Sequence, residues 1–174
     1  LALKGGTALN VFHLKLDRLS VDIDLNYVGA LDRETMIKER PQVEKALEAL
    51  VAAQGYAIKR QAASYAGGKW ILRHASALGG NGNLEVDLNY LYREPIFGAE
   101  RIDSVRLGDA QARGVLVLHR NEIAAGKLVA LLNRQAARDL FDARRIFEMA
   151  GLDWDLIRPA MLVIGAAQEK DWRT

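Results

Sequence analysis

Two aspartates, Asp22 and Asp24, lie one residue apart in a stretch where polar and aliphatic side chains alternate. Alternation with a period of two is typical of a β-strand, so both carboxylates would project from one face, with their Cβ atoms within about 7 Å of each other. Two unit charges about 4 Å apart repel by about 4 kcal/mol at an effective dielectric constant of about 20. A divalent cation between the carboxylates would reverse this penalty, and oxygen ligands favour a hard ion such as Mg²⁺. The pair is therefore a candidate metal site.

A second alternating stretch, Leu84 to Tyr92, could supply a third carboxylate from a neighbouring strand. Both Glu85 and Asp87 fall on the polar face of that stretch, and of the two we prefer Asp87. Three carboxylates can hold two Mg²⁺ ions about 4 Å apart, which activate an attacking hydroxyl and clamp the phosphate being transferred. A solvated strand face shows the same alternation, so the acidic residues alone leave both interpretations open.

A glycine pair, Gly5-Gly6, stands between a predicted strand at Leu1 to Lys4 and a predicted helix from Thr7 to about Lys15. The N-terminus of a helix carries free N–H groups and favours anions, so this turn could contact a phosphate. The alternative is an ordinary turn in which the Thr7 hydroxyl caps the helix.

The elements that must position these residues follow from periodicity, turn residues and capping residues. The predicted strands, besides Leu1 to Lys4, are Arg18 to Tyr27, Tyr56 to Gln61, Lys69 to Ala75, Leu84 to Tyr92 and Val115 to His119. The predicted helices are Thr7 to Lys15, Arg33 to Gln54 with a break or kink at Pro41, Glu122 to Arg134, Arg138 to Ala150 and Leu156 to Ala167. The three consecutive strands in the middle of the chain could form an antiparallel meander. On the predicted strand Arg18 to Tyr27, Arg18 and Ser20 would share the face of the two aspartates.

Composition limits the class of protein. The 174 residues contain no cysteine, which excludes disulfides, thiolate catalysis and cysteine-ligated zinc. A net charge of +2 is only mildly basic and does not by itself indicate a nucleic-acid partner. No apolar run has the length of a membrane helix, and we expect a cytoplasmic protein. Because the chain begins inside a predicted strand, we also expect the natural protein to extend further toward its N-terminus.

Three motifs, taken together and in this order, resemble one known family. They are Lys4-Gly5-Gly6-Thr7-Ala8-Leu9, then Arg18-x-Ser20-x-Asp22-Ile23-Asp24-Leu25, then Lys127-Leu128-x-Ala130-Leu131 with Arg134 and Arg138-Asp139-Leu140-x-Asp142. The pattern is similar to the AbiEii-type nucleotidyltransferase toxins of bacterial abortive-infection and toxin–antitoxin systems, a branch of the DNA polymerase β superfamily. The resemblance runs from Lys4 to about Phe147.

The resemblance implies an α+β fold: a polymerase β-like nucleotidyltransferase core with a mixed or antiparallel sheet, followed by C-terminal helices. We expect the core over residues 1–120 and a helical part over 121–174, packed together as one domain. The implied activity is Mg²⁺-dependent transfer of a nucleoside monophosphate from a nucleoside triphosphate to an acceptor, most plausibly RNA such as tRNA. A cognate antitoxin that forms no stable complex is implied as well, and no membrane is involved.

The resemblance also assigns roles to residues. The implied catalytic residues are Asp22, Asp24, Asp87, Lys127 and Asp139, of which the first three would bind two Mg²⁺ ions. The implied nucleotide contacts are Gly5, Gly6, Thr7, Arg18, Ser20, Lys127 and Arg134. Arg18 and Ser20 could instead orient the carboxylates.

Two questions stay open at this point. On an unbroken helix Asp139 would turn about 120° away from the stripe that carries Lys127 and Arg134, so its role requires a bend near Gln135; Asp142 is the alternative carboxylate. The acceptor could also be a protein, or the chain could be a catalytically silent nucleotide-binding domain. The Asp-x-Asp pair and Lys127 argue against silence, because the loss of those charges is the simplest way to abolish the chemistry.

Overall fold

The computed structural model describes residues 1–14, 16, 18–20, 22–60 and 67–167. The chain divides into two compact units, one made of Leu1–Ala2 and Val21–Glu94, the other of Leu3–Ser20 and Pro95–Thr174. Lys15 and Gln61, which end predicted elements, lie outside the described residues, as does Val21 of the predicted strand Arg18 to Tyr27. The division into residues 1–120 and 121–174 stays a prediction.

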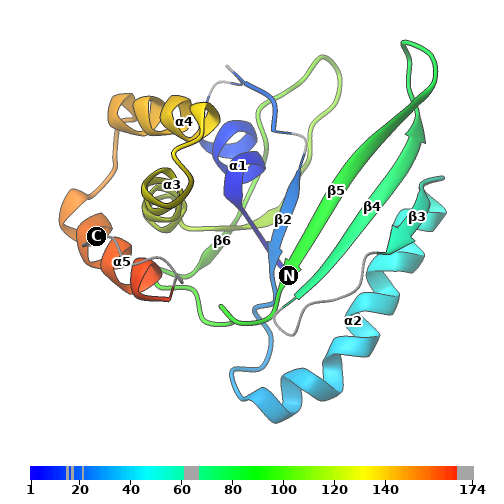
Figure 1. The fold of residues 1–174 in the computed structure, drawn as a ribbon, viewed down its shortest axis with the longest axis horizontal. Coiled ribbons are helices and arrows are strands. Elements are labelled where there is room, and N and C mark those ends of the chain that lie inside the picture. The colour runs from blue at the N-terminus through cyan, green and yellow to red at the C-terminus, as the bar shows by residue number, and fades with distance from the viewer. Residues whose placement is uncertain (15, 17, 21, 61–66, 168–174) are drawn as a thin grey trace. The chain divides into compact units, whose positions relative to one another are not determined.

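The first unit is a mixed sheet with one long helix (Figure 1). Its strands are β2 (Ile23–Asn26), β3 (Ala57–Arg60), β4 (Gly67–Ala75) and β5 (Asn81–Asn89), and its helix is α2 (Arg33–Ala53). Strands β3, β4 and β5 pair antiparallel in sequence order, which confirms the predicted meander. Strand β2 pairs with β5 in the parallel sense.

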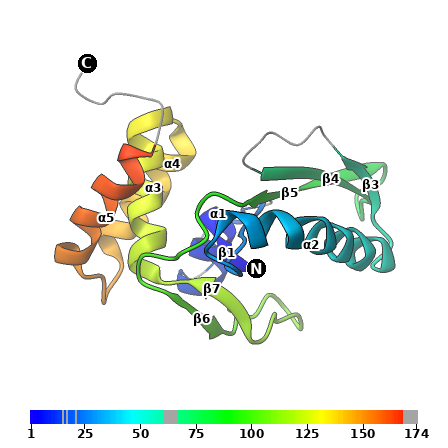
Figure 2. The same ribbon diagram turned by 90° about the horizontal axis from the view of Figure 1, so that it is seen from below.

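Helix α2 lies along one face of this sheet (Figure 2) and buries the apolar half of each strand against itself. On β4 the buried side chains are Trp70 and Leu72, and their register partners on β5 include Val86. The Trp70 indole N–H donates to Glu48 of α2 over 2.9 Å, so the one polar atom of that ring is satisfied. Because side chains alternate along a strand, the opposite face carries the polar residues of β4 and β5.

The break expected at Pro41 does not occur, since α2 runs through it as a single helix. A proline inside a helix removes one backbone hydrogen bond at a cost of roughly 3 kcal/mol, which the packing of α2 on the sheet must offset. The helix begins after Asp32, whose carboxylate accepts from the Thr35 N–H, and ends before Gly55 at a φ of 82°. Both ends match the sequence prediction.

The second unit combines a three-stranded mixed sheet with N-terminal and C-terminal helices. Its elements are β1 (Ala2–Lys4), α1 (Gly5–Ala8), the π-helical turn η1 (Leu9–His13), β6 (Ala99–Ile102), β7 (Val115–Leu118), α3 (Arg120–Arg134), α4 (Ala137–Glu148) and α5 (Trp154–Ala166). Strand β7 pairs with β1 in parallel and with β6 antiparallel. Helix α3 lies between α4 and α5 (Figure 1).

The chain bends sharply between α3 and α4. Gln135 adopts a left-handed conformation at a φ of 52°, and Ala136 is extended. This confirms the bend that an active-site role for Asp139 requires, although no glycine or proline announces it. Left-handed geometry is uncommon for residues other than glycine, asparagine and aspartate, so the sequence carried no local signal for it.

Two local predictions around the N-terminal motifs are wrong. The first helix begins at Gly5 rather than Thr7, and its N-cap position is Lys4, so the Thr7 hydroxyl does not cap it but donates to the Ser20 carbonyl over 3.3 Å. Strand β2 begins only at Ile23, so Arg18 and Ser20 precede the strand instead of sharing its face with the aspartates. The Arg18 side chain pairs with a carboxylate on α4, a long-range contact that periodicity cannot reveal.

The predicted fold class is confirmed: α+β, with mixed sheets and helices gathered toward the C-terminal end. In the part of the chain that the structure describes, no helix combines the length and the apolar character needed to span a membrane.

Candidate active site

The acidic residues meet on the polar face of β2 and β5 in the first unit. Asp24 and Asp87 are register partners on these parallel strands, which places them side by side about 4.8 Å apart in the pairing direction. Asp22 stands just before β2, and Glu85 lies two positions before Asp87 on the same face. Burial raises the pKa of Asp87; the Lys69 ammonium opposes this shift, and the charges of Asp24, Glu85 and Asp22 add to it. The neighbouring carboxylates therefore repel Asp87, and a bound cation would relieve this repulsion.

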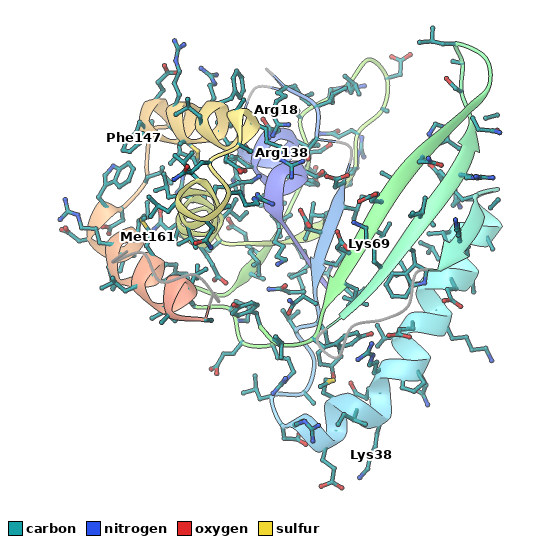
Figure 3. All side chains as sticks on the ribbon, viewed as in Figure 1. Arg18, Lys38, Lys69, Arg138, Phe147 and Met161 are labelled. Carbon is teal, nitrogen blue, oxygen red and sulfur yellow. The ribbon has the colours of Figure 1, made fainter. Side chains whose placement is uncertain are left out.

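Lys69, labelled in Figure 3, is a member of this face that the sequence analysis missed. It projects from β4 as the register partner of Asp87, and its Nζ lies 2.5 Å from Glu85 Oε2 and 3.7 Å from Asp87 Oδ2. The hydrogen bond to Glu85 is the main cause that raises the pKa of Lys69. A lone lysine on a strand gives no signal of its role, because the role depends on the pairing register of β4 and β5.

The donor chemistry of this face fits Mg²⁺, because all its candidate ligands are hard carboxylate oxygens from adjacent strand positions. Among the described residues, however, no three acidic or histidine side chains converge on one point where an ion could sit. Binding would therefore require the carboxylates to change rotamer, and at least one of them is drawn toward Lys69 instead.

The second unit gathers the residues predicted to contact phosphate. A Cβ atom placed on Gly6 would lie 2.6 Å from Ser20 Oγ and 3.3 Å from Lys127 Nζ, so glycine lets the backbone approach both groups without displacing either side chain. Gly5 precedes it in the left-handed conformation at a φ of 72°. Gly6, the Ser20 hydroxyl and Lys127 form one compact set of donors suited to an anion, and the Thr7 hydroxyl beside them donates to the Ser20 carbonyl.

Asp142 holds this set in place from α4. Its two oxygens accept from Arg18 Nη2 at 3.0 Å each, and Oδ2 lies 2.9 Å from Lys127 Nζ, while the aspartate side chain is completely buried. Burial alone would raise the pKa of Asp142, but the hydrogen bonds and charges of Lys127 and Arg18 outweigh it and lower the pKa below its ordinary value. The Lys127 ammonium uses one of its three donors here, which leaves others for a ligand.

Asp139 is also completely buried on α4 and accepts from Arg134 Nη2 at 2.9 Å. Its second oxygen, Oδ2, has no hydrogen-bond partner among the described residues. Asp142 rather than Asp139 therefore contacts Lys127, a distinction that the sequence left open and that depends on the bend at Gln135.

Within each unit the structure brings predicted site residues together. The first unit contains Asp22, Asp24 and Asp87. The second unit contains Gly5, Gly6, Thr7, Arg18, Ser20, Lys127, Arg134 and Asp139.

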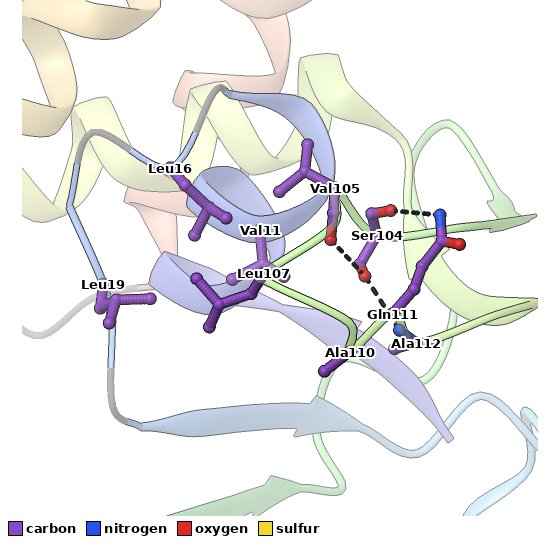
Figure 4. A pocket seen from close by; sticks show the side chains of 9 residues that line it. All are labelled: Val11, Leu16, Leu19, Ser104, Val105, Leu107, Ala110, Gln111 and Ala112. Atoms are coloured by element: carbon purple, nitrogen blue, oxygen red, sulfur yellow. Dashed lines mark hydrogen bonds between the residues drawn. The ribbon is translucent and has the colours of Figure 1, made fainter.

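The second unit also has an apolar pocket of about 400 Å³, shown in Figure 4. Val11, Leu16, Leu19 and Leu107 contribute to its lining. Its one hydroxyl, Ser104 Oγ, donates to the Val105 carbonyl and accepts from a backbone N–H within the same loop. With its hydroxyl already engaged and its walls aliphatic, the pocket does not suit a charged nucleotide.

Comparisons with known proteins show the family and the fold of the chain. The chain matches the family described as nucleotidyl transferase AbiEii toxin, type IV toxin–antitoxin system, over residues 1–171. No curated protein sequence matches it. The crystal structure of JHP933 from Helicobacter pylori is similar at a TM-score of 0.59 and 17% identity, covering 98% of this chain and 76% of that one. MenT4, a nucleotidyltransferase toxin from Mycobacterium tuberculosis, is similar at a TM-score of 0.66 and 21% identity, covering 94% of this chain and 55% of that one.

Proposed function

The chain belongs to the AbiEii nucleotidyltransferase toxin family of type IV toxin–antitoxin systems, and from this premise we propose that it transfers a nucleoside monophosphate from a nucleoside triphosphate to RNA, such as tRNA, with Mg²⁺. The enzyme class and the triphosphate substrate follow from the family; the metal and the acceptor are our proposal. The observation that carries it is the register pairing of Asp24 with Asp87, which puts two carboxylates side by side on adjacent strands.

We assign the metal to Asp22, Asp24 and Asp87. When bound there, Mg²⁺ would supply the positive charge that neutralises the transferring phosphate and makes the acceptor hydroxyl easier to deprotonate. The carboxylates contribute ligand oxygens and negative charge, and Asp24 and Asp87 are fixed relative to each other by the strand pairing. Asparagine in either position would keep the shape and remove the charge.

We assign the β and γ phosphates of the nucleotide to the donors around Gly6. Lys127 supplies a point charge, and the Gly6 backbone with the Ser20 hydroxyl supplies neutral donors. The Thr7 hydroxyl, which donates to the Ser20 carbonyl here, would turn toward the phosphate when the nucleotide binds. Asp142 does not contact the nucleotide in this proposal but fixes the position of the Lys127 ammonium, and Arg18 in turn holds Asp142. Arg134 is half exposed beside Asp139 and can offer its remaining donors to the nucleotide.

Lys127→Ala is expected to weaken nucleoside triphosphate binding by about 1.5 to 3 kcal/mol, the usual range for a hydrogen bond to a charged group. Binding of the corresponding monophosphate should change much less, because it lacks the phosphates that we assign to Lys127. Isothermal calorimetry with both nucleotides measures the difference. An equal loss for the two nucleotides would place Lys127 away from the β and γ phosphates.

The acceptor can be identified in one experiment. The protein is incubated with each α-labelled nucleoside triphosphate, Mg²⁺ and either purified total RNA or cell extract, and the products are separated on a denaturing gel. We expect label on an RNA band that is lost in the Asp24→Asn variant. Label on a protein band alone would replace the RNA proposal with the protein-modifying alternative, and no label with any acceptor would favour a silent nucleotide-binding domain.

Arg144 and Arg145 on α4 are candidates for guiding the RNA. Both pair with Glu148, at 3.1 Å and 2.6 Å, and exposed pairs of this kind contribute only about 0 to 1 kcal/mol, so RNA phosphates could replace the glutamate. Neutralising both arginines should lower the dependence of log Kd on log salt by roughly one unit per lost phosphate contact, while triphosphate affinity stays unchanged.

A matched control is Arg158→Gln on α5, which removes an exposed arginine with a similar helical partner, Asp155. RNA binding at several salt concentrations, measured by fluorescence anisotropy, should change only with the α4 variant. The same loss in both variants, or salt-independent binding, would remove α4 from the acceptor surface.

We also propose that the antitoxin implied by the family acts without a stable complex.

A further inference from the structure

Lys69 lies on the acidic face of the first unit, and its ammonium is not where strand register alone would place it. Lys69 lies directly across from Asp87 in the antiparallel pairing of β4 and β5, and Ile71 lies across from Glu85. The Lys69 ammonium nevertheless reaches diagonally to Glu85 at 2.5 Å and stays 3.7 Å from Asp87. Lys69 thus forms its ion pair with Glu85, which is further away in the strand register, and not with Asp87 directly opposite.

We propose that Lys69 is a positioning residue of the metal site: it neutralises Glu85 and thereby leaves Asp87 as the third metal ligand beside Asp22 and Asp24. This inference rests on the proposed metal site and adds to it the reason for choosing between two carboxylates on one strand face.

The charges on this face explain what Lys69 does there. Asp22, Asp24, Glu85 and Asp87 place four carboxylates along the start of β2 and the adjacent part of β5. Three of them suffice to hold the metal ions, and a fourth would compete as a ligand or repel its neighbours. The Ile71 side chain opposite Glu85 offers no charge, and the cation that pairs with Glu85 comes diagonally from Lys69.

The register also explains why Asp87 is the carboxylate that remains available. Asp87 is the cross-strand partner of Asp24. Glu85 lies two positions earlier on β5, where the same register would bring it level with Asp22, just outside the paired residues of β2. A metal ion that binds Asp24 therefore finds Asp87 at the shortest cross-strand distance. Glu85 is thus held in the ion pair with Lys69, and Asp87 stays available as a metal ligand.

The test is a double-mutant cycle read by Mn²⁺ binding, measured by electron paramagnetic resonance without nucleotide. In Glu85→Gln the ammonium loses its partner and turns to Asp87, so Mn²⁺ binding should weaken about five- to tenfold. In Lys69→Gln/Glu85→Gln both charges are absent and binding should return to within about twofold of the wild-type value. Lys69→Gln alone should tighten binding by a few-fold, because a repelling cation is removed.

A matched control is Arg73→Gln. Arg73 lies on the same strand and the same face, opposite Asn83. Arg73→Gln removes the same charge from that face and keeps the Lys69–Glu85 ion pair, so its effect on Mn²⁺ binding should stay within about twofold. Thermal unfolding of each variant checks that the fold is kept.

Two outcomes would overturn the proposal. If Glu85→Gln loses Mn²⁺ as severely as Asp87→Asn and the added Lys69 substitution restores nothing, Glu85 is itself a ligand. If neither single variant changes binding, Lys69 has no influence on the site. Asp24→Asn separates these from a failure of the proposed function: unchanged Mn²⁺ binding in that variant would mean that the metal site itself is misplaced.

Discussion

Asp24→Asn is expected to reduce nucleotidyl transfer at least a hundredfold, since it removes ligand charge from the centre of the acidic face while keeping the side-chain volume. A single preorganised group that stabilises developing charge commonly contributes a factor of about 10² to 10³ in rate. Asp22→Asn should behave in the same way. Transfer of labelled nucleotide to RNA, followed over time at saturating Mg²⁺, measures the loss.

The fold should survive these substitutions. Asp24 is one of the charges that raise the pKa of Asp87, so its removal relieves repulsion, and the midpoint of thermal unfolding should stay unchanged or rise slightly. Glu94→Gln, an exposed carboxylate change in the same unit, is the control and should retain full activity. Near-normal transfer by both aspartate variants would show that the metal assignment is wrong.

Regular periodicity explains which elements could be predicted. Strands β4 and β5 alternate strictly between polar residues and buried residues such as Trp70 and Val86, and they were found close to their predicted bounds. Helices α3, α4 and α5 were found within about two residues of the prediction, as expected for apolar stripes with clear stop signals. Strand β6, whose middle residues are Glu100 and Arg101, has no such pattern and was missed.

The site divides in a similar way. Asp22, Asp24 and the glycine turn stand close together in the sequence and could be recognised by type and spacing. Lys69 could not, because its role comes from the register between β4 and β5. Register depends on the packing of a whole sheet against α2 and not on the residues near the lysine.

Asp142 shows the same limit more sharply. Arg18 and Asp142 are 124 positions apart, and their contact depends on the left-handed Gln135 that turns α4 relative to α3. Sequence reasoning could identify the need for a bend but could not decide whether Asp139 or Asp142 would face Lys127. Both aspartates are three residues apart on one helix face, and only the tertiary contacts separate their partners.

Asp142→Asn is expected to lower the free energy of unfolding by about 3 to 5 kcal/mol at pH 7, the usual cost of removing one partner from a buried ion pair. The variant leaves two cations, Arg18 and Lys127, next to a neutral amide that can satisfy neither charge. Triphosphate binding should weaken as well, because the lysine loses the contact that fixes its ammonium beside Gly6. Urea unfolding at pH 7 measures the stability change.

The pH dependence gives this prediction a second, independent readout. The native pKa of Asp142 is lowered by Lys127 and Arg18 against the effect of burial, whereas the unfolded value is about 3.9. Its contribution to stability is therefore complete above the unfolded pKa and is lost as the pH falls through the native pKa. The difference between wild type and Asp142→Asn should shrink as the pH is lowered below about 4. Asp155→Asn, which removes an exposed partner of Arg158, should cost at most about 1 kcal/mol and show little of this trend. A difference that stays constant with pH would mean that lost packing, not the ion pair, accounts for the destabilisation.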